Sequence, residues 1–214
     1  MPGTRRKIKM TWTELKRQRS TLERYERYLP TLQLKQQQLQ AAILQTRREH
    51  DEARQAASVC REKISGYEAV FRDLAGLNLD VLSEPDEIKT ITVNLAGVKV
   101  PVFESAGFPE AVYSLFGTPA WVDRALADQR EHNRHLAELG IVEQGLALLQ
   151  AELRKVMQRV NLFEKVMIPE ARENIRRIRV ALGDRMTAAV ARAKMAKEKL
   201  EKRKSREKAE AGPA

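Results

Sequence analysis

The sequence predicts a mainly α-helical protein. We expect its N-terminal and C-terminal helices to form a long, bent, antiparallel two-helix coiled coil, with a small central segment containing a β-hairpin. Of the 214 residues, 32% are charged and only 5% are aromatic, which is typical of long helices and not of a large globular core. Two long stretches carry apolar residues at alternating steps of three and four, and glycine and proline become frequent between them.

The first helix is predicted over residues 11–75. Thr11 is a suitable N-cap, and Glu14 three residues later completes a capping box. From Leu15 onward, most of the core positions of the heptad repeat, called seats below, are apolar. Such strict seven-residue spacing indicates a left-handed supercoil with another helix. The seats are Leu15, Gln18, Leu22, Tyr25, Leu29, Leu32, Gln36, Leu39, Ile43, Thr46, His50, Ala53, Ala57, Cys60, Ile64, Tyr67, Phe71 and Leu74.

The central segment is predicted over residues 76–118. Residues from about 88 to 103 alternate between apolar and polar types around Ala96-Gly97, which predicts a β-hairpin with a glycine in its turn. Pro101 lacks an amide donor, so its strand should be an edge strand or be broken there. Because a lone hairpin is marginal in water, we expect it to lean on the adjoining helix ends.

The second helix is predicted over residues 119–208, with Thr118 as N-cap and Pro119 in its first turn, and residues 209–214 are predicted to be a disordered tail. The run from Ile141 to Leu200 has no obvious loop. Its stripe of apolar residues is too narrow for a helix of a compact bundle and indicates the buried seam of a coiled coil. The seats are Val142, Leu146, Leu149, Leu153, Val156, Val160, Phe163 and Met167, then Ile175, Ile178, Leu182, Met186, Ala189, Ala193, Ala196 and Leu200.

Two helices joined by a compact turn run antiparallel if they pair with each other. Placing residue 75 level with residue 120 makes the numbers of facing residues add to about 195. Pro30 then faces residue 165, within one turn of Pro169, and two prolines at one level predict a single bent rod. Residues beyond Lys194 should extend past the partner helix. This agreement favours pairing within the chain over a parallel dimer.

Charge is unevenly distributed. Residues 1–75 hold 16 basic and 9 acidic side chains, residues 76–125 hold 3 and 7, and residues 126–214 hold 20 and 13. A basic arm can meet nucleic acid, an anionic membrane surface or an acidic protein, and net charge does not choose among them. A single cysteine, Cys60, fits a reducing compartment, and no apolar run approaches the length that spans a bilayer. We therefore expect a soluble, cytoplasmic protein.

Little in the sequence indicates catalysis. There is no phosphate-binding loop, no dinucleotide-binding glycine pattern and no nucleophile elbow. His132 and His135 share a helix face with Glu131 and Asp128 nearby, but one histidine pair without a clear remaining ligand set predicts no metal site. Cys60 occupies an apolar seat, which favours a buried structural thiol. His50 is interpreted as a polar seat in the seam.

The basic stretch 194–208 could attract phosphates. Specific nucleic-acid modules usually add stacking aromatic residues or a recognisable fold, and this chain has no aromatic residue after Phe163. Three glutamates, Glu198, Glu201 and Glu207, also dilute the positive charge. The sequence therefore favours a solvated or protein-facing helix end over a nucleic-acid site.

Several blocks resemble the D subunit of the V/A-type rotary ATPases. The most specific is Arg-Val-Asn-Leu-Phe-Glu-Lys-Val-Met-Ile-Pro at residues 159–169, followed by Ile-Arg-Arg-Ile at 175–178 and Arg-Ala-Lys at 192–194. Leu-Pro-Thr-Leu-Gln-Leu-Lys at 29–35 and Gly-Thr-Pro-Ala-Trp at 117–121 are similar to the same family. The resemblance spans nearly the whole chain in the expected order.

The resemblance implies a central rotor shaft that is not itself catalytic. In this family the terminal helices enter a hexameric head of catalytic A and B subunits, and the middle segment points toward the membrane. The F subunit binds the shaft there, and the C subunit couples it to the membrane ring. The implied chain needs no cofactor or metal, binds no nucleic acid, does not insert into the membrane and is no homo-oligomer. It would be cytoplasmic and peripheral to the membrane.

We hypothesise that cations on the 172–203 stretch make transient contacts with the head, because exposed ion pairs are worth only about 0–1 kcal/mol each and can be exchanged during rotation. The expected contacts are Arg172, Arg176, Arg177, Arg185, Arg192, Lys194, Lys197, Lys202 and Arg203. The alternatives are a coiled-coil scaffold without a rotary role and, less favoured, a basic nucleic-acid-binding rod.

Overall fold

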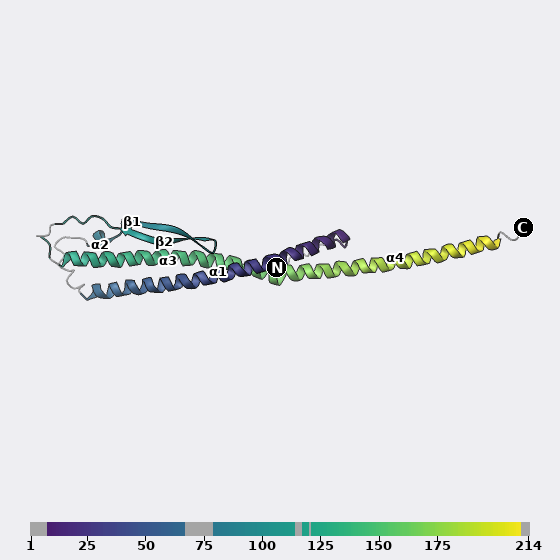
Figure 1. Ribbon diagram of the computed structural model, residues 1–214, viewed down its shortest axis with the longest axis horizontal. Helices are drawn as coiled ribbons and strands as arrows, with labels where there is room; N and C mark the ends of the chain where they lie inside the picture. The colour runs from purple at the N-terminus through teal and green to yellow at the C-terminus, as the bar shows by residue number, and fades with distance from the viewer. Residues whose placement is uncertain (1–7, 67–78, 114–116, 120, 211–214) are drawn as a thin grey trace. The chain divides into compact units, whose positions relative to one another are not determined.

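A computed structural model describes residues 8–66, 79–113, 117–119 and 121–210 (Figure 1). The elements are α1 (Trp12–Ser65), α2 (Leu79–Ser83), β1 (Glu87–Leu95), β2 (Val98–Gly107), α3 (Val122–Leu162), a π-helical segment (Phe163–Met167) and α4 (Ile168–Glu210). They form two compact units, one made of residues 1–31 with 159–214 and the other of residues 32–158. The mainly helical fold with one hairpin is confirmed.

Helix α1 has the predicted start and the predicted seam. The amide of Glu14 donates to Thr11 Oγ1 at 3.3 Å, which is the N-cap bond. All the predicted seats from Leu15 to Ile64 are buried or half-buried, whereas the off-seam apolar residues Leu34, Leu44 and Val59 are exposed. The narrow stripe is therefore the buried face. Residues 67–75, including the last three predicted seats, lie outside the described residues.

In the unit of residues 32–158, α1 pairs with α3 in antiparallel direction. Lys35 Nζ lies 3.5 Å from Glu152, and His50 Nε2 lies 3.3 Å from Glu143, so moving forward along α1 means moving backward along α3. His50 is half-buried, as predicted for a polar seat. Fully buried seam residues include Leu39, Leu149 and Val156. Pairing within the chain is thus confirmed in this unit.

In the unit of residues 1–31 and 159–214, α1 pairs with α4. Leu15 of α1 forms an apolar cluster with Ile175, Ile178 and Leu182 of α4. Tyr25 meets Phe163 edge to face, with ring centroids 5.2 Å apart. Arg185 donates to the backbone oxygen of Met10 at 2.7 Å, which matches the predicted register.

The overlap between the helices ends earlier than predicted. Leu182 is the last buried residue of α4, and every side chain from Gly183 to Arg206 is exposed within the described residues. The prediction that the overhang begins only beyond Lys194 is therefore wrong. The reason is that α1 starts at Trp12, and the last apolar residues packed against the Leu15 cluster from that end are Ile8 and Met10.

The second arm is helical without a loop from Val122 to Glu210. It begins after a turn in which the Val122 amide donates to Pro119 O. A π-helical turn at Phe163–Met167 precedes Pro169, and the Ile168 amide donates to Phe163 O, five residues back. This wider turn lies directly before the proline that cannot donate. Pro30 lies inside α1. The bends at Pro30 and Pro169 stay predictions.

The predicted hairpin is confirmed and is slightly longer than expected. Ala96 and Gly97 form its two-residue turn with φ of 51° and 82°, the positive values of a type I′ turn. The strands are antiparallel, with Val93 opposite Val100 and an irregularity between Lys89 and Thr90. Pro101 pairs with Thr92 in a two-stranded sheet, so its strand is an edge strand.

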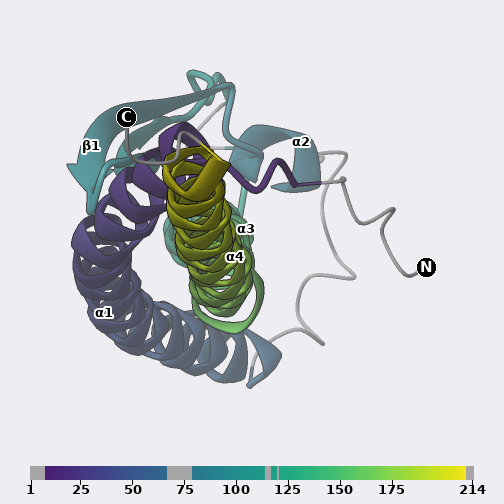
Figure 2. The same cartoon turned by 90° about the vertical axis from the view of Figure 1, so that its right-hand side faces the viewer.

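The hairpin packs on the middle of α3 and not on the helix ends that the sequence suggested. Val100, 3% exposed, sits over Gly145, and a Cβ at Gly145 would lie 2.7 Å from Val100 Cγ1. The glycine thus allows the close approach of β2 to α3. Figure 1 shows the hairpin running along α3, and Figure 2 shows β1 and α2 on the same side of that helix.

Two side chains of α3 hold the rest of the central segment. Arg130 donates to Leu82 O at 3.0 Å and to Pro109 O at 2.6 Å, and its guanidinium lies 5.5 Å from the centre of the Phe108 ring. Asn133 donates to Ser83 O at 2.8 Å. These bonds satisfy backbone oxygens on both sides of the hairpin, so the segment is fixed to α3 at both ends.

The Gly145 contact predicts a contrast between two glycines of α3. We expect Gly145→Ala to lower the free energy of unfolding by about 1 kcal/mol, since overpacking costs about 1–3 kcal/mol and helix propensity returns about 1. Gly140 has no atom within 4 Å of an added Cβ, so Gly140→Ala should instead raise it by up to about 1 kcal/mol. Urea unfolding followed by circular dichroism measures both. Equal stability of the two variants, with unchanged hydrogen exchange in β2, would contradict the packing.

Candidate functional site

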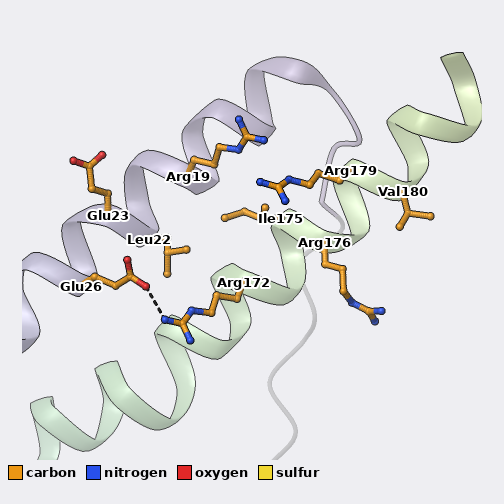
Figure 3. Close-up of a pocket in the computed structure, with 9 residues that line it drawn as sticks. All are labelled: Arg19, Leu22, Glu23, Glu26, Arg172, Ile175, Arg176, Arg179 and Val180. Atoms are coloured by element: carbon orange, nitrogen blue, oxygen red, sulfur yellow. Dashed lines mark hydrogen bonds and ion pairs between the residues drawn. The ribbon is translucent and has the colours of Figure 1, made fainter.

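A surface groove lies between α1 and α4 and is lined mainly by charged side chains. Its volume is about 590 Å³. Ile175 and Leu22 form its floor, and four arginines and two glutamates surround it (Figure 3). The lining residues are Arg19, Leu22, Glu23, Glu26, Arg172, Ile175, Arg176, Arg179 and Val180.

Two of the predicted partner-binding cations hold the helices of this unit together. Arg172 Nη2 lies 2.7 Å from Glu26 Oε1 across the groove, as the dashed line in Figure 3 shows. Arg185 donates to Met10 O. Both side chains are therefore occupied within the chain, which the sequence hypothesis did not anticipate.

Arg176 and Arg177 share one carboxylate on their own helix. Arg176 donates to Glu173 through Nε at 2.8 Å and Nη2 at 3.0 Å, and Arg177 Nε donates to it at 2.9 Å. The hydrogen bonds from Arg176, then those from Arg177, lower the pKa of Glu173 from 4.5 to about 2. Bonds of this spacing stabilise a helix turn and partly neutralise both cations.

The remaining predicted cations divide into two groups. Lys197 lies 3.9 Å from Glu201 and Lys202 lies 2.6 Å from Glu198, and Arg203 also interacts within the chain. Arg192 and Lys194 are exposed, and neither forms an ion pair with the described part of the chain. Of the nine predicted contacts, these two form neither an ion pair nor a hydrogen bond with the described part of the chain.

The sequence hypothesis missed two further cations, Arg19 of α1 and Arg179 of α4. Figure 3 shows their guanidinium groups pointing toward each other across the groove. Both are exposed, and neither forms an ion pair among residues 8–66, 79–113, 117–119 and 121–210. Two like charges on one groove create a positive potential that attracts a carboxylate. The predicted register, which places each residue of α1 level with a residue of α4, is the sequence signal from which their proximity could have been predicted.

Helix α4 also exposes apolar residues beyond the groove. Met186, Val190 and Leu200 are 58%, 57% and 59% exposed and fall on one side of the helix at helical spacing. They belong to the part of α4 that extends past α1. Their exposure means that the seam predicted there has no cover from the described chain.

A different cluster lies between α1 and α3. One ligand atom each of Cys60, Glu131 and His135 lies within 4.8 Å of the others. Burial and then the charge of Glu131 raise the pKa of the Cys60 thiol. Cys60 is buried, as predicted, but the sequence analysis did not place it beside the α3 side chains. His132, which was considered together with His135, is not in the cluster and has a buried Nδ1 without a hydrogen-bond partner among the described residues.

None of the helices, over the residues described, has a stretch both long and apolar enough to cross a membrane.

Comparison with known proteins gives one consistent family. The family model for the D subunit of ATP synthase matches residues 14–198. The V-type ATP synthase D subunit of Borreliella burgdorferi is 38% identical over 200 residues, covering 92% of this chain and 96% of the relative. The corresponding D subunits of Chlamydia pneumoniae and Chlamydia caviae are 35% and 34% identical, covering 93% and 92% of this chain and 96% and 95% of the relatives.

The Glu173 pairs predict an unusual titration. Carbon-13 NMR of the Glu173 carboxyl should give a pKa of about 2, so the pairs are intact above pH 4.5 and are lost as the pH falls toward 2. Replacing Arg176 and Arg177 by glutamine should return the pKa to its ordinary range. Arg172→Gln is the control, because Arg172 contacts Glu26 and not Glu173. An ordinary pKa in the unaltered protein would refute the pairing.

Proposed function

The chain belongs to the ATP synthase D-subunit family, and from that premise we propose that it is the central rotor shaft of a V/A-type ATPase. It transmits torque between ATP hydrolysis or synthesis in a head of A and B subunits and ion translocation by a membrane ring. The family match over residues 14–198, on a chain built as two paired long helices, is the observation that carries the proposal.

The helix pair suits a shaft physically. A single helix bends and twists easily, and two helices with interlocked seams resist both better because each side chain of one is held by several of the other. The outward faces of α1 and α4 are rich in charged side chains, which limits apolar adhesion when the shaft turns inside a protein sleeve. Both properties support a transmission role.

We place no catalytic step in this chain. Its sequence has no phosphate-binding loop, and the carboxylates of the groove are engaged with arginines of the same unit or lie on its rim. ATP chemistry belongs in this proposal to the A and B subunits. The chain supplies the asymmetric surface that those subunits meet in turn.

The contacts with the head come from four exposed cations that form no ion pair with the described part of the chain. These are Arg19 and Arg179 in the groove, and Arg192 and Lys194 on the overhanging part of α4. Each exposed pair with a carboxylate of the head contributes about 0–1 kcal/mol. Contacts this weak can be broken and remade as the shaft turns.

The remaining partners meet other surfaces. The overhanging part of α4, with Met186, Val190 and Leu200 exposed, enters the sleeve formed by the A and B subunits. The hairpin exposes the apolar side chains of Ile91, Val93 and Val102, and these side chains bind the F subunit. The C subunit couples the membrane-proximal end to the ring. The family match does not favour the two alternatives, a coiled-coil scaffold without a rotary role and a basic nucleic-acid-binding rod.

The proposed contacts predict a charge-dependent affinity for the head. Replacing Arg19, Arg179, Arg192 and Lys194 together by glutamine should weaken binding to the reconstituted A/B head by about 30-fold, that is about 2 kcal/mol for four exposed pairs. Coupled ATP hydrolysis should fall in parallel.

The matched control replaces four other exposed arginines, Arg47, Arg48, Arg54 and Arg61 of α1, which lie in the unit of residues 32–158. The control removes the same net charge and should bind the head as the unaltered shaft does. Equal losses in the two quadruple variants would mean that only net charge matters, and no loss in the first would remove these contacts from the proposal.

A further inference from the structure

We propose that Cys60, Glu131 and His135 form a binding site for a thiophilic divalent cation, best matched by Zn²⁺, that ties α1 to α3. Cys60 is 7% exposed and comes from α1, and Glu131 and His135 come from α3. One thiol, one carboxylate and one imidazole atom lie within 4.8 Å of one another. None of the three was assigned a partner-binding role by the sequence.

The spacing on α3 explains why two ligands converge. Glu131 and His135 are four residues apart, so both side chains leave the same face of the helix. That face is turned toward α1 at the level of Cys60. Two atoms bound to one tetrahedral Zn²⁺ at about 2.0–2.3 Å are separated by roughly 3.5 Å, so side-chain adjustments of about 1 Å close the site.

The histidine is oriented by a neighbouring carboxylate. His135 Nδ1 lies 3.4 Å from Glu138 Oε2 on the next turn of α3. With the proton on Nδ1 and directed at Glu138, Nε2 keeps its lone pair for a metal. A carboxylate behind the ligating imidazole is the usual second partner of a histidine in zinc sites, because it fixes the ring and increases its basicity.

The ligand types select the ion. A sulfur ligand disfavours Mg²⁺ and Ca²⁺, which prefer oxygen, and favours Zn²⁺ or its substitutes Co²⁺ and Cd²⁺. On binding, the Cys60 thiol releases its proton to solvent and a metal–sulfur bond forms, with no change of oxidation state. Three protein ligands leave a fourth position for water.

The position of the site gives it a mechanical role. Cys60 lies in the second-last turn of α1, which ends at Ser65, and Glu131 lies about nine residues into α3, which begins at Val122. Helix ends separate first when a pair opens. A metal ion bridging the two helices there would hold them together at their joined ends. The inference does not depend on the rotor function.

Cobalt binding to the full-length chain tests the site. The chelator-treated, reduced protein should bind one Co²⁺ per chain, with a thiolate-to-cobalt charge-transfer band in the near ultraviolet that Zn²⁺ displaces. Cys60→Ala should abolish the band, and His135→Gln and Glu131→Gln should each weaken binding at least tenfold. Zn²⁺ should raise the Tm of the unaltered protein more than that of His135→Gln.

His50→Gln is the matched control. His50 also lies between α1 and α3 and contacts two carboxylates, Asp51 and Glu143, but has no thiol beside it among the described residues. This variant should bind Co²⁺ like the unaltered protein. No charge-transfer band at one equivalent, or a band that survives Cys60→Ala, would overturn the proposal. If Cys60→Ala does not fold, unchanged binding by the His135→Gln and Glu131→Gln variants, which alter more exposed positions, would overturn it equally.

Discussion

The structure depends on one constraint: a narrow apolar seam on a long helix must be covered by a second helix that runs beside it. Neither arm has enough apolar surface to fold alone, because the stripe occupies only two seats in seven. Antiparallel pairing within one chain satisfies both stripes at once. It brings Leu39 of α1 and Leu149 of α3 into full burial in one unit, and Leu15 and Ile178 into one cluster in the other. Most side chains of α1 and α4 that do not belong to the seam are left on the surface.

The charged residues differ in the contacts that they make within the chain. Cations near the seam are used to join the helices, as in Arg172 with Glu26 and Lys35 with Glu152. Others are paired along their own helix, as around Glu173. Others again, including Arg179 and Arg192, are exposed and form no ion pair with the described part of the chain. Net charge alone therefore does not show which cations of a basic chain are already paired within it.

Features that depend on local spacing could be predicted from the sequence. The seats from Leu15 to Ile64, the Thr11 cap and the Ala96-Gly97 turn follow from periodicity and backbone preference, and the structure confirms them. Features that depend on contacts between distant segments were missed. The position of the hairpin depends on the contact between Val100 and Gly145. The predicted register, carried to Met1, places the overhang of α4 too far along the chain, because α1, as its cap predicts, begins only at Trp12.

The two sites show the same limit more sharply. The predicted register places Cys60 opposite residue 135, but the spacing of the histidines along α3 alone does not show that a thiol lies beside them. Likewise, nearness in sequence alone does not show which basic residues of α4 are paired. The structure of the paired helices shows that the two arginines differ: Arg172 contacts Glu26, whereas Arg179 faces Arg19. Pairing decides which charges remain available.

Rotation is the central claim, and it can be observed directly. Cys60 is buried, so a cysteine placed at exposed Glu104 on the hairpin gives a selective attachment point for a bead. With the A/B head fixed to a surface, ATP should drive continuous rotation of the bead in one direction. A bead that stays still while the same complexes hydrolyse ATP would contradict the account of this chain as a rotor shaft.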